Sequence, residues 1–530
     1  MNLGALGPYL DRGTQSGSSQ VYGAQVAQDG LLRQLLTNSV VDEVELFVTS
    51  LLPRHAVKQS QYTAAAIAAS FGGARRPRLR QLAELPLTLL EVDYAFLSSG
   101  PWSHRLGQLR AVLDRPGFGI TTLMHSVYWF DLLPHFLALC LTSRSHDTVV
   151  VTSEAAAKAM KSVLSWCSES HRLRFNGAMV TIPFGIDPAE VNVLDRTMSR
   201  RLLGLPTEDP VLAYVGRLSD EYKGDLTCLV SLLRELVDEF PGVRLVMAGS
   251  DQSEHGSSVM AHARALGVAD KAMIIASPTD AVKALVLSAA DVFVSPVDNI
   301  QESFGLSILE AMATGLPVVA SDWSGYRDLI VDGESGFLIE TFWDPNLAAE
   351  LSLTNPLEVT YGLAHRLALH TFLNLEMMLS RLRQLLRNPA LRRRMGEAGK
   401  ARAVSHFSTS RVVEAYRLLF ADQRERAAMT RAVPVPAFSL DKAFGHYATS
   451  RMDEGTLVRT SMSLSHQSRF AATDGIRREV EDRLIGQCGR CRSWFEVLEG
   501  CPPTDQETLF RLVKSGRLTL GREIEGDSEA

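Results

Sequence analysis

Residues 295–313 read SPVDNIQESFGLSILEAMA, and this stretch carries the clearest structural and chemical signal in the chain. An apolar run at 292–294 leads into Ser-Pro, a polar loop follows, and apolar side chains then recur every three to four residues from Leu306 onward. We therefore predict a strand, a loop and a helix over 304–314, which is the repeating unit of a doubly wound α/β sheet. Gly305 at the helix start would let an anion approach backbone N–H groups with no Cβ in the way.

Two glutamates lie on either side of the predicted helix start. Glu302 belongs to the loop before the helix, and Glu310 lies nearly two turns inside it. Carboxylates accept hydrogen bonds from vicinal hydroxyl groups, so the pair suits a sugar on one side of a phosphate and a ribose on the other. Taken singly, Glu302 is better explained as an acidic residue that complements the helix dipole, and Glu310 as a surface charge.

A second segment places two cations near the same position in the fold. Residues 214–224 read YVGRLSDEYKG, in which a strand runs into Gly216, Arg217 follows, and Lys223 stands at the predicted start of a helix. A guanidinium and an ammonium at the carboxyl end of a strand suit a diphosphate leaving group. The alternative is a pair of solvated loop charges.

His125 is the third candidate. It follows a predicted strand at 120–124 and would point across a cleft toward Glu302. A lone histidine is more often structural or merely exposed, so His125 gains weight only beside the other motifs.

Length and composition limit the class of protein. A chain of 530 residues is long enough for several domains, and 46% hydrophobic with 22% charged residues excludes global disorder, collagen and coiled coil. A formal net charge of −6 gives no electrostatic reason to expect a nucleic-acid partner. The N-terminus lacks the features of a signal peptide, and the most apolar segment, 132–141, is too short to span a bilayer. We therefore expect a cytoplasmic protein.

Short β-branched runs alternate with amphipathic stretches and predict two doubly wound α/β domains. We place an N-terminal domain at 1–186, a second domain at 187–404 and an appended small module at 437–530. The predicted strands are 44–48, 94–97, 120–124, 149–152, 180–183, 211–215, 243–248, 272–275, 292–294 and 318–320. The predicted helices are 21–36, 104–114, 154–164, 223–239, 258–266, 280–289 and 304–314. Ligands bind beyond the carboxyl ends of such strands, so two facing domains imply a cleft.

Taken together, these motifs resemble those of the retaining glycosyltransferases of family four, which have the GT-B fold. Glu302 and Glu310, with seven residues between them, match the double-glutamate motif of that family, and Arg217 and Lys223 match its cationic pair. Four further segments match in wording and order: 182–187, 314–320, 332–338 and 406–410. The resemblance implies two Rossmann-like domains that face a cleft, a helix at 405–425 that crosses back to the N-terminal domain, and a C-terminal appendage outside the family core.

The resemblance also implies an activity. The chain would move a hexosyl group from a nucleotide-sugar donor to an acceptor, with retention at the anomeric carbon, in carbohydrate biosynthesis. No metal or other cofactor would be obligatory, because two cations and a helix N-terminus can neutralise a departing diphosphate. The acceptor is open between a sugar, a lipid-linked molecule, a small molecule and a peptide.

Each motif has a role by this resemblance. Arg217 and Lys223 would bind the donor diphosphate, and Glu310 would hold the ribose hydroxyl groups. Glu302 would contact the donor sugar, and His125 would touch that sugar from the acceptor side. The remaining donor-binding positions supply small residues or backbone groups: Gly216, Phe304, Gly305 and Leu306.

One departure from the family pattern leaves an alternative open. The family commonly has a paired-glycine loop after the first strand, whereas residues 11–20 read DRGTQSGSSQ. The alternative is a catalytically weak or inactive scaffold of the same fold, whose C-terminal module recruits partners. The basic run at 75–80 could face acidic lipid, although so short a run is more often simply solvated.

The C-terminal module holds three cysteines, Cys488, Cys491 and Cys501. A zinc site normally has four ligands, and the nearby histidines are irregularly spaced, so a buried thiol cluster is favoured over zinc. Residues 504–518 predict a helix followed by a short strand, as in a winged-helix-like piece.

Overall fold

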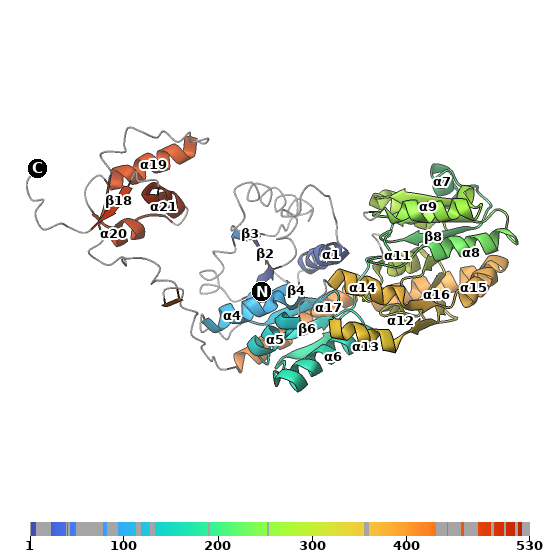
Figure 1. Ribbon diagram of the computed structural model, residues 1–530, viewed down its shortest axis with the longest axis horizontal. Helices are drawn as coiled ribbons and strands as arrows, with labels where there is room; N and C mark the ends of the chain where they lie inside the picture. Colours follow the sequence, from blue (N-terminus) through green and yellow to red (C-terminus); the bar gives the residue numbers. More distant parts are fainter. Residues whose placement is uncertain are drawn as a thin grey trace, which may run out of the picture. The chain divides into compact units, whose positions relative to one another are not determined.

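The computed structural model describes residues 2–6, 23–38, 40, 43–48, 78–81, 94–112, 118–127, 133–188, 191–251, 254–354, 360–430, 442–443, 457–460, 475–488, 492–502, 505–514 and 518–521. The chain divides into two compact units, Met1–Val435 and Pro436–Ala530. The first unit contains two parallel sheets, each covered by helices (Figure 1).

The first sheet has seven parallel strands in the order β3-β2-β1-β4-β5-β6-β7. Its strands are β1 (Asn2–Leu6), β2 (Glu43–Val48), β3 (Arg78–Gln81), β4 (Tyr94–Ser99), β5 (Ile120–Met124), β6 (Thr148–Val151) and β7 (Ala178–Thr181). Its helices include α1 (Gly23–Thr37), α4 (His104–Val112), α5 (Leu133–Thr142) and α6 (Glu154–His171). Every residue of β5 and β6 is buried, as expected for central strands covered on both faces.

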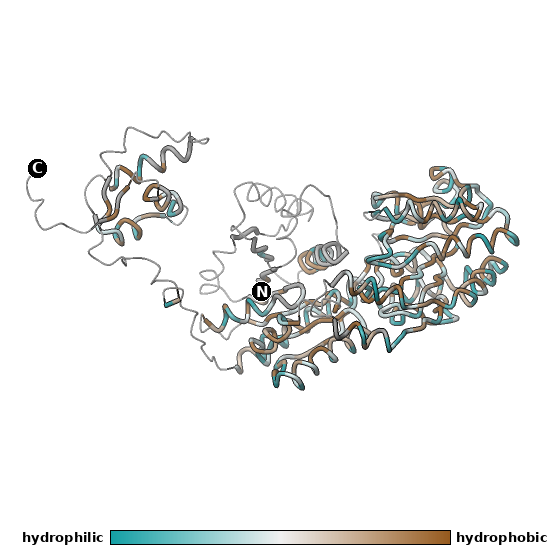
Figure 2. Tube along the Cα trace, viewed as in Figure 1, coloured by the Kyte–Doolittle hydropathy of each residue, from teal (hydrophilic) through white to brown (hydrophobic). Residues whose placement is uncertain are grey.

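The second sheet has six parallel strands in the order β10-β9-β8-β11-β12-β13. They are β8 (Val211–Val215), β9 (Arg244–Gly249), β10 (Ala272–Ala276), β11 (Val292–Ser295), β12 (Val318–Ser321) and β13 (Gly336–Ile339). The helices around it are α7 (Arg196–Leu202), α8 (Thr227–Val237), α9 (His255–Ala265), α10 (Asp280–Ala289), α11 (Leu306–Thr314), α12 (Tyr326–Leu329), α15 (Leu375–Arg387) and α16 (Pro389–Phe407). Hydrophobic and hydrophilic residues alternate along these helices, as they do where one face is buried (Figure 2).

An insert follows β13. It consists of β14 (Thr341–Trp343), α13 (Pro345–Thr354), α14 (Thr360–Leu369) and β15 (Thr371–Leu373), and its two strands pair antiparallel. It lies between β13 and α15 in the chain.

Helix α17 (Thr409–Ala428) comes from the end of the first unit but packs on the first sheet. Its Val412, Tyr416 and Phe420 share one hydrophobic core with Leu3 of β1 and Leu97 of β4. The predicted bounds of this helix, 405–425, move because α16 continues through position 407 before the chain turns.

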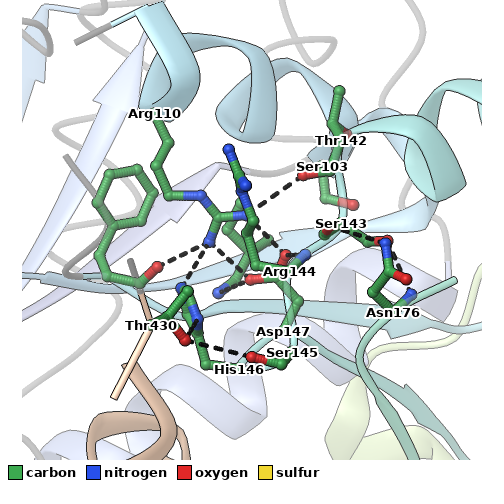
Figure 3. Close-up of polar contacts among 12 residues, drawn as sticks. Ser103, Arg110, Thr142, Ser143, Arg144, Ser145, His146, Asp147, Asn176 and Thr430 are labelled. Carbon is green, nitrogen blue, oxygen red and sulfur yellow. Dashed lines mark hydrogen bonds and ion pairs between the residues drawn. The ribbon is translucent and has the colours of Figure 1, made fainter. Parts of the chain in front are cut away.

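A buried ion pair fixes one edge of the first domain (Figure 3). The Arg110 guanidinium of α4 donates to both carboxylate oxygens of Asp147, at 2.8 and 2.7 Å. The same carboxylate accepts the N–H groups of Ile120 at 3.0 Å and Arg144 at 2.8 Å. His146 links the cluster to the end of α17 through a 3.2 Å contact between its Nδ1 and Thr430 Oγ1.

The second unit holds a three-stranded antiparallel sheet in the order β17-β16-β18. Its elements are β16 (Leu457–Thr460), α19 (Gly475–Gln487), β17 (Arg492–Ser493), α20 (Trp494–Glu499), α21 (Gln506–Lys514) and β18 (Leu518–Gly521). Helix α21 and strand β18 confirm the predicted helix and strand near 504–518. Residues 11–20 and 75–77 and Cys491, which carried predictions, lie outside the described residues.

The ten strands and seven helices predicted by residue range for the two α/β domains are all confirmed in the structure, most of them with shifted bounds. The prediction that Lys223 stands at a helix start is wrong. The Asp225 carboxylate accepts the N–H of Thr227 at 2.9 Å, so α8 begins at Thr227, and Lys223 lies in a turn closed by its own N–H bond to the Ser219 carbonyl. Strands β1, β3 and β13 of the two parallel sheets were not predicted.

Candidate functional site

The candidate site lies at the carboxyl ends of β8 and β11, which are neighbours in the second sheet. Strand order runs outward in opposite directions from this pair, toward β10 on one side and β13 on the other. The loops after two such strands separate and leave a crevice in which doubly wound proteins bind ligands. The loop after β8 carries Arg217 and Lys223, and the loop after β11 carries Glu302.

Lys223 and Glu302 form an ion pair. Lys223 Nζ lies 2.5 Å from Glu302 Oε2, and the side chains are 22% and 10% exposed. Burial alone would raise the pKa of Glu302, but the Lys223 ammonium and the Phe304 N–H, which donates to Oε1 at 3.2 Å, hold that pKa below its ordinary value. Glu302 is therefore a carboxylate at neutral pH.

Arg217 lies beside this pair. Its Nη2 donates to Gln301 Oε1, and its guanidinium lies 5.2 Å from the centroid of the Tyr222 ring. Among the described residues, Gln301 is the only hydrogen-bond acceptor of this guanidinium. Most of its N–H donors are thus available to an anion.

The start of α11 depends on Gly305. Its φ is +111°, and a Cβ there would meet the Tyr326 ring at 2.6 Å. Glycine is therefore required by both backbone conformation and space. The helix begins at Leu306, two residues later than predicted, and no N-cap side chain bonds its first N–H groups.

Phe304 serves the core rather than the crevice. Its ring is buried and packs edge-to-face on Phe184 at 5.5 Å and on Phe407 at 6.0 Å. Its N–H already bonds Glu302, so the predicted role of this N–H as a donor to a ligand requires that bond to be exchanged.

Glu310 is half-buried on the second turn of α11. Burial raises the pKa of Glu310. Of the two smaller effects, Lys283 lowers that pKa and Asp280 raises it. Within the described part of the chain, no side chain or backbone group forms a hydrogen bond or ion pair with its carboxylate. A carboxylate so placed favours an external hydroxyl or N–H donor.

His125 lies at the end of β5, in the first domain. Its ring stacks on Phe184, with centroids 5.5 Å apart, and both ring nitrogens are buried with no partner in the described residues. Burial lowers its pKa to about 4, so the ring is neutral at neutral pH. An unpaired buried imidazole costs stability and is typical of a group that bonds a ligand.

Hydrogen bonds from the first domain bring His125 to the Glu302 loop. The Ser303 hydroxyl donates to the His125 carbonyl, and the Ser126 hydroxyl donates to the Gln301 carbonyl at 3.1 Å. Segment 125–126 of the first domain thus lies against segment 301–303 of the second.

Sequence reasoning missed the amide side chains in the Glu302 loop. Gln301 accepts from Arg217, and Asn299 is fully buried with bonds to two other loops. The sequence NIQE at 299–302 carried this signal, because two amide residues precede Glu302 there.

The described residues contain no group of three or more His, Cys, Asp or Glu side chains placed to hold a metal ion. Cys488 and Cys501 are buried in the core of the second unit. Across the same described ranges, no helix has the length and apolar character needed to cross a bilayer.

Residues 195–353 match the family model of glycosyl transferases group 1. A D-inositol 3-phosphate glycosyltransferase of Segniliparus rotundus is 32% identical over 282 residues, which cover 46% of this chain and 62% of that protein. A phosphatidyl-myo-inositol mannosyltransferase of Mycobacterium tuberculosis is 34% identical over 164 residues, covering 30% and 39%. The chain thus spans less than two thirds of the length of these curated relatives.

Solved structures share the fold of the first unit. Sucrose-phosphate synthase from Thermosynechococcus elongatus aligns with a TM-score of 0.53 at 18% identity, over 79% of this chain and 99% of that one. Anabaena Alr3699/HepE in complex with UDP and glucose aligns with a TM-score of 0.53 at 16% identity, over the same shares. The two facing parallel sheets are the GT-B fold.

Proposed function

We propose that this chain, whose residues 195–353 match the family model of glycosyl transferases group 1, is a retaining glycosyltransferase. It moves a hexosyl group from a nucleotide-sugar donor to an acceptor hydroxyl. The observation that carries the proposal is the meeting of Arg217, Lys223 and Glu302 at the carboxyl ends of β8 and β11.

The donor diphosphate binds the two cations. Lys223 exchanges part of its contact with Glu302 for a phosphate oxygen, and the unused donors of Arg217 take the other phosphate. As the bond from the anomeric carbon to the diphosphate breaks, the growing negative charge lies between these cations and the first turn of α11. This arrangement supplies the stabilisation without a metal ion.

The sugar and the ribose bind to the carboxylates on either side. Glu302, ionised at neutral pH, accepts hydrogen bonds from the sugar hydroxyl groups, and Glu310 accepts those of the ribose. The neutral His125 ring contacts the sugar from the first domain. A ring nitrogen that has no partner among the described residues then forms a hydrogen bond with a sugar hydroxyl group.

Acceptor choice belongs to the first domain. Two relatives are named for inositol 3-phosphate and phosphatidyl-myo-inositol, so cyclitol phosphates are the first acceptors to test. Sugars, lipid-linked molecules, other small molecules and peptides follow.

The test is thermal unfolding with UDP, GDP, ADP and their sugar conjugates. A nucleotide at about a hundred times its dissociation constant stabilises the native state by about 2.7 kcal/mol. We expect one nucleotide class to raise the Tm of the wild type and to lose that effect in Arg217→Ala. Arg327→Ala removes an exposed arginine that pairs with Asp322, and serves as the matched control.

Turnover separates the enzyme from the scaffold alternative. Release of the nucleoside diphosphate in the presence of an acceptor supports the enzyme, whereas binding without turnover across the acceptor panel supports the scaffold. A wild type that binds no nucleotide at all contradicts the proposal.

A further inference from the structure

A fully buried amide side chain lies directly behind the candidate site. Asn299 is 0% exposed and stands in the loop after β11, three residues before Glu302. Buried amides are costly unless their donors and acceptors are paired, so the partners of Asn299 indicate what it holds in place.

Its bonds reach two other loops. Asn299 Nδ2 donates to the Glu221 carbonyl at 2.8 Å, within the loop that carries both candidate cations. The Asn299 carbonyl accepts from Trp323 Nε1 at 3.0 Å, in the loop after β12. One residue thus joins the loops that follow three neighbouring strands.

Asn299 also shapes its own loop. Its Oδ1 accepts the N–H of Gln301 at 2.9 Å, and its carbonyl accepts the N–H of Glu302 at 3.1 Å. These two residues are the ones whose side chains meet Arg217 and Lys223. The side-chain amide therefore holds the backbone of Gln301, and the backbone carbonyl of the same residue holds that of Glu302.

The insert supports the same loop from outside. Ile300 packs against Leu351, Leu363 and Leu367 of α13 and α14. His365 of α14 lies with its Nδ1 3.4 Å from the Asp220 carbonyl, in the loop after β8. The insert thus contacts both the loop after β8 and the loop after β11, two of the loops that Asn299 joins.

We propose that Asn299 is a positioning residue. It sets the Gln301–Glu302 segment against the Arg217–Lys223 loop before a ligand arrives, and so determines the affinity for the diphosphate of a nucleotide. The identity of the ligand rests on the proposed function, but the placement of the two loops does not.

The first experiment measures the loops themselves. Hydrogen exchange of the full chain, followed by mass spectrometry, is compared between wild type and Asn299→Ala. We expect faster exchange in the peptides that cover 217–223 and 299–305. Asn374→Ala is the matched control, because Asn374 also pairs through both ends of its amide, with Glu340 and the Met377 N–H, but lies away from the site.

The second experiment uses pH. In Asn299→Asp, a protonated carboxyl can still donate to the Glu221 carbonyl, whereas a carboxylate cannot, and burial favours the protonated form. We expect the nucleoside diphosphate affinity of Asn299→Asp, relative to wild type at each pH, to recover as pH falls from 8 to 6. Asn299→Ala should stay weakened by about tenfold throughout.

The outcomes separate the two proposals. Unchanged exchange at 217–223 in Asn299→Ala, or wild-type nucleotide affinity in that variant, overturns the positioning role. A pH response of Asn299→Asp identical to that of Asn299→Ala also overturns it, because a purely space-filling role would not distinguish them. A wild type that binds no nucleotide refutes the proposed function, while the exchange comparison still decides whether Asn299 holds the loops.

Discussion

Two ion pairs of the first unit, Arg110–Asp147 and Lys223–Glu302, are built in opposite ways. Asp147 receives four hydrogen bonds, two of them from Arg110, and the two side chains are 5% and 2% exposed. Among the described residues, the Lys223 ammonium pairs with Glu302 alone, and the Lys223 side chain is 22% exposed. The Arg110–Asp147 pair thus satisfies its carboxylate completely, whereas the Lys223–Glu302 pair leaves donors and acceptors uncommitted.

This difference separates charges that hold a fold from charges that meet a ligand. Breaking a buried ion pair is costly, and removing Asp147 would leave the desolvated Arg110 guanidinium without its counter-charge. Incomplete pairing recurs around Lys223, since Arg217 has one hydrogen-bond acceptor in the described structure and His125 has no partner there. Incomplete pairing of several neighbouring groups identifies the site better than any one charge.

The largest effect tests the structural pair. Asp147→Ala should lower the free energy of unfolding by about 3–5 kcal/mol, because it strands the buried Arg110 and leaves two backbone N–H groups unpaired. Urea unfolding measures the loss. The double variant Arg110→Met/Asp147→Leu should recover part of it, and a single variant as stable as wild type would contradict this assignment.

The second prediction tests the Lys223–Glu302 pair. Here we expect a large loss of activity and only a small loss of stability. Lys223→Met should lower turnover about a hundredfold, because a positive charge beside the leaving group is lost. Its free energy of unfolding should change by only about 1 kcal/mol. Lys271→Met removes a lysine that lies 3.7 Å from Asp270, and should leave both quantities near wild type.

The third effect concerns Glu310, whose pKa is raised by burial. A carboxyl with a raised folded-state pKa favours the fold at low pH and loses that contribution as pH rises, so its ionised form opposes folding at neutral pH. Glu310→Gln should therefore leave the Tm of the free protein at pH 7 unchanged or higher. Its nucleotide affinity should fall about tenfold through the loss of a charged hydrogen bond, as measured by calorimetry.

A converse result would be equally informative for Glu310. If Glu310→Gln destabilised the free protein and bound nucleotide normally, the carboxylate would be a structural charge like Asp147.

The smallest effect lies at the edge of the Arg110 cluster. Arg110 can only donate, so His146 Nε2 accepts from it at 3.1 Å, and the proton on Nδ1 goes to Thr430. Burial lowers the pKa of His146, with Asp147 opposing that shift and Arg110 and Arg426 adding to it. A lowered folded-state pKa means that the contribution of neutral His146 is present above about pH 6.5 and is lost as pH falls below it.

His146→Gln keeps an acceptor and a donor but does not titrate. We expect its free energy of unfolding to fall less steeply than that of wild type between pH 7 and pH 5, by a modest margin. Parallel curves for the two proteins would remove His146 from the pH response.

The second domain could be predicted closely from the sequence, because local signals there agree with one another. Five apolar runs became β8 to β12, and Glu302, Arg217 and Lys223 met as their positions after strands required. Helix α8 started late because the Asp225 side chain ends the preceding turn, a contact that competes with helix formation and leaves no periodic signal.

Contacts between distant residues could not be predicted. Arg110 and Asp147 are 37 positions apart. The residues around each of them do not distinguish it from a charged residue on the surface. Asn299 reads as an ordinary loop amide, and only the fold shows that Glu221 and Trp323 meet it. Strand β13 was missed because it begins with a glycine, a residue that in the sequence suggests a turn. Only its pairing with β12 in the structure identifies it as a strand.

The chain passes between the two sheets twice, and the two passages lie against each other. The N–H of Ile186 donates to the Phe407 carbonyl at 2.8 Å, and the N–H of Thr409 donates to the Ile186 carbonyl at 3.0 Å. A single covalent link would let one domain swivel about its own axis, whereas two links bonded side by side resist twisting and permit bending. We expect the crevice to open and close by hinge bending about one axis, so that Ser126 and Ser303 form hydrogen bonds with the same partners again after each cycle.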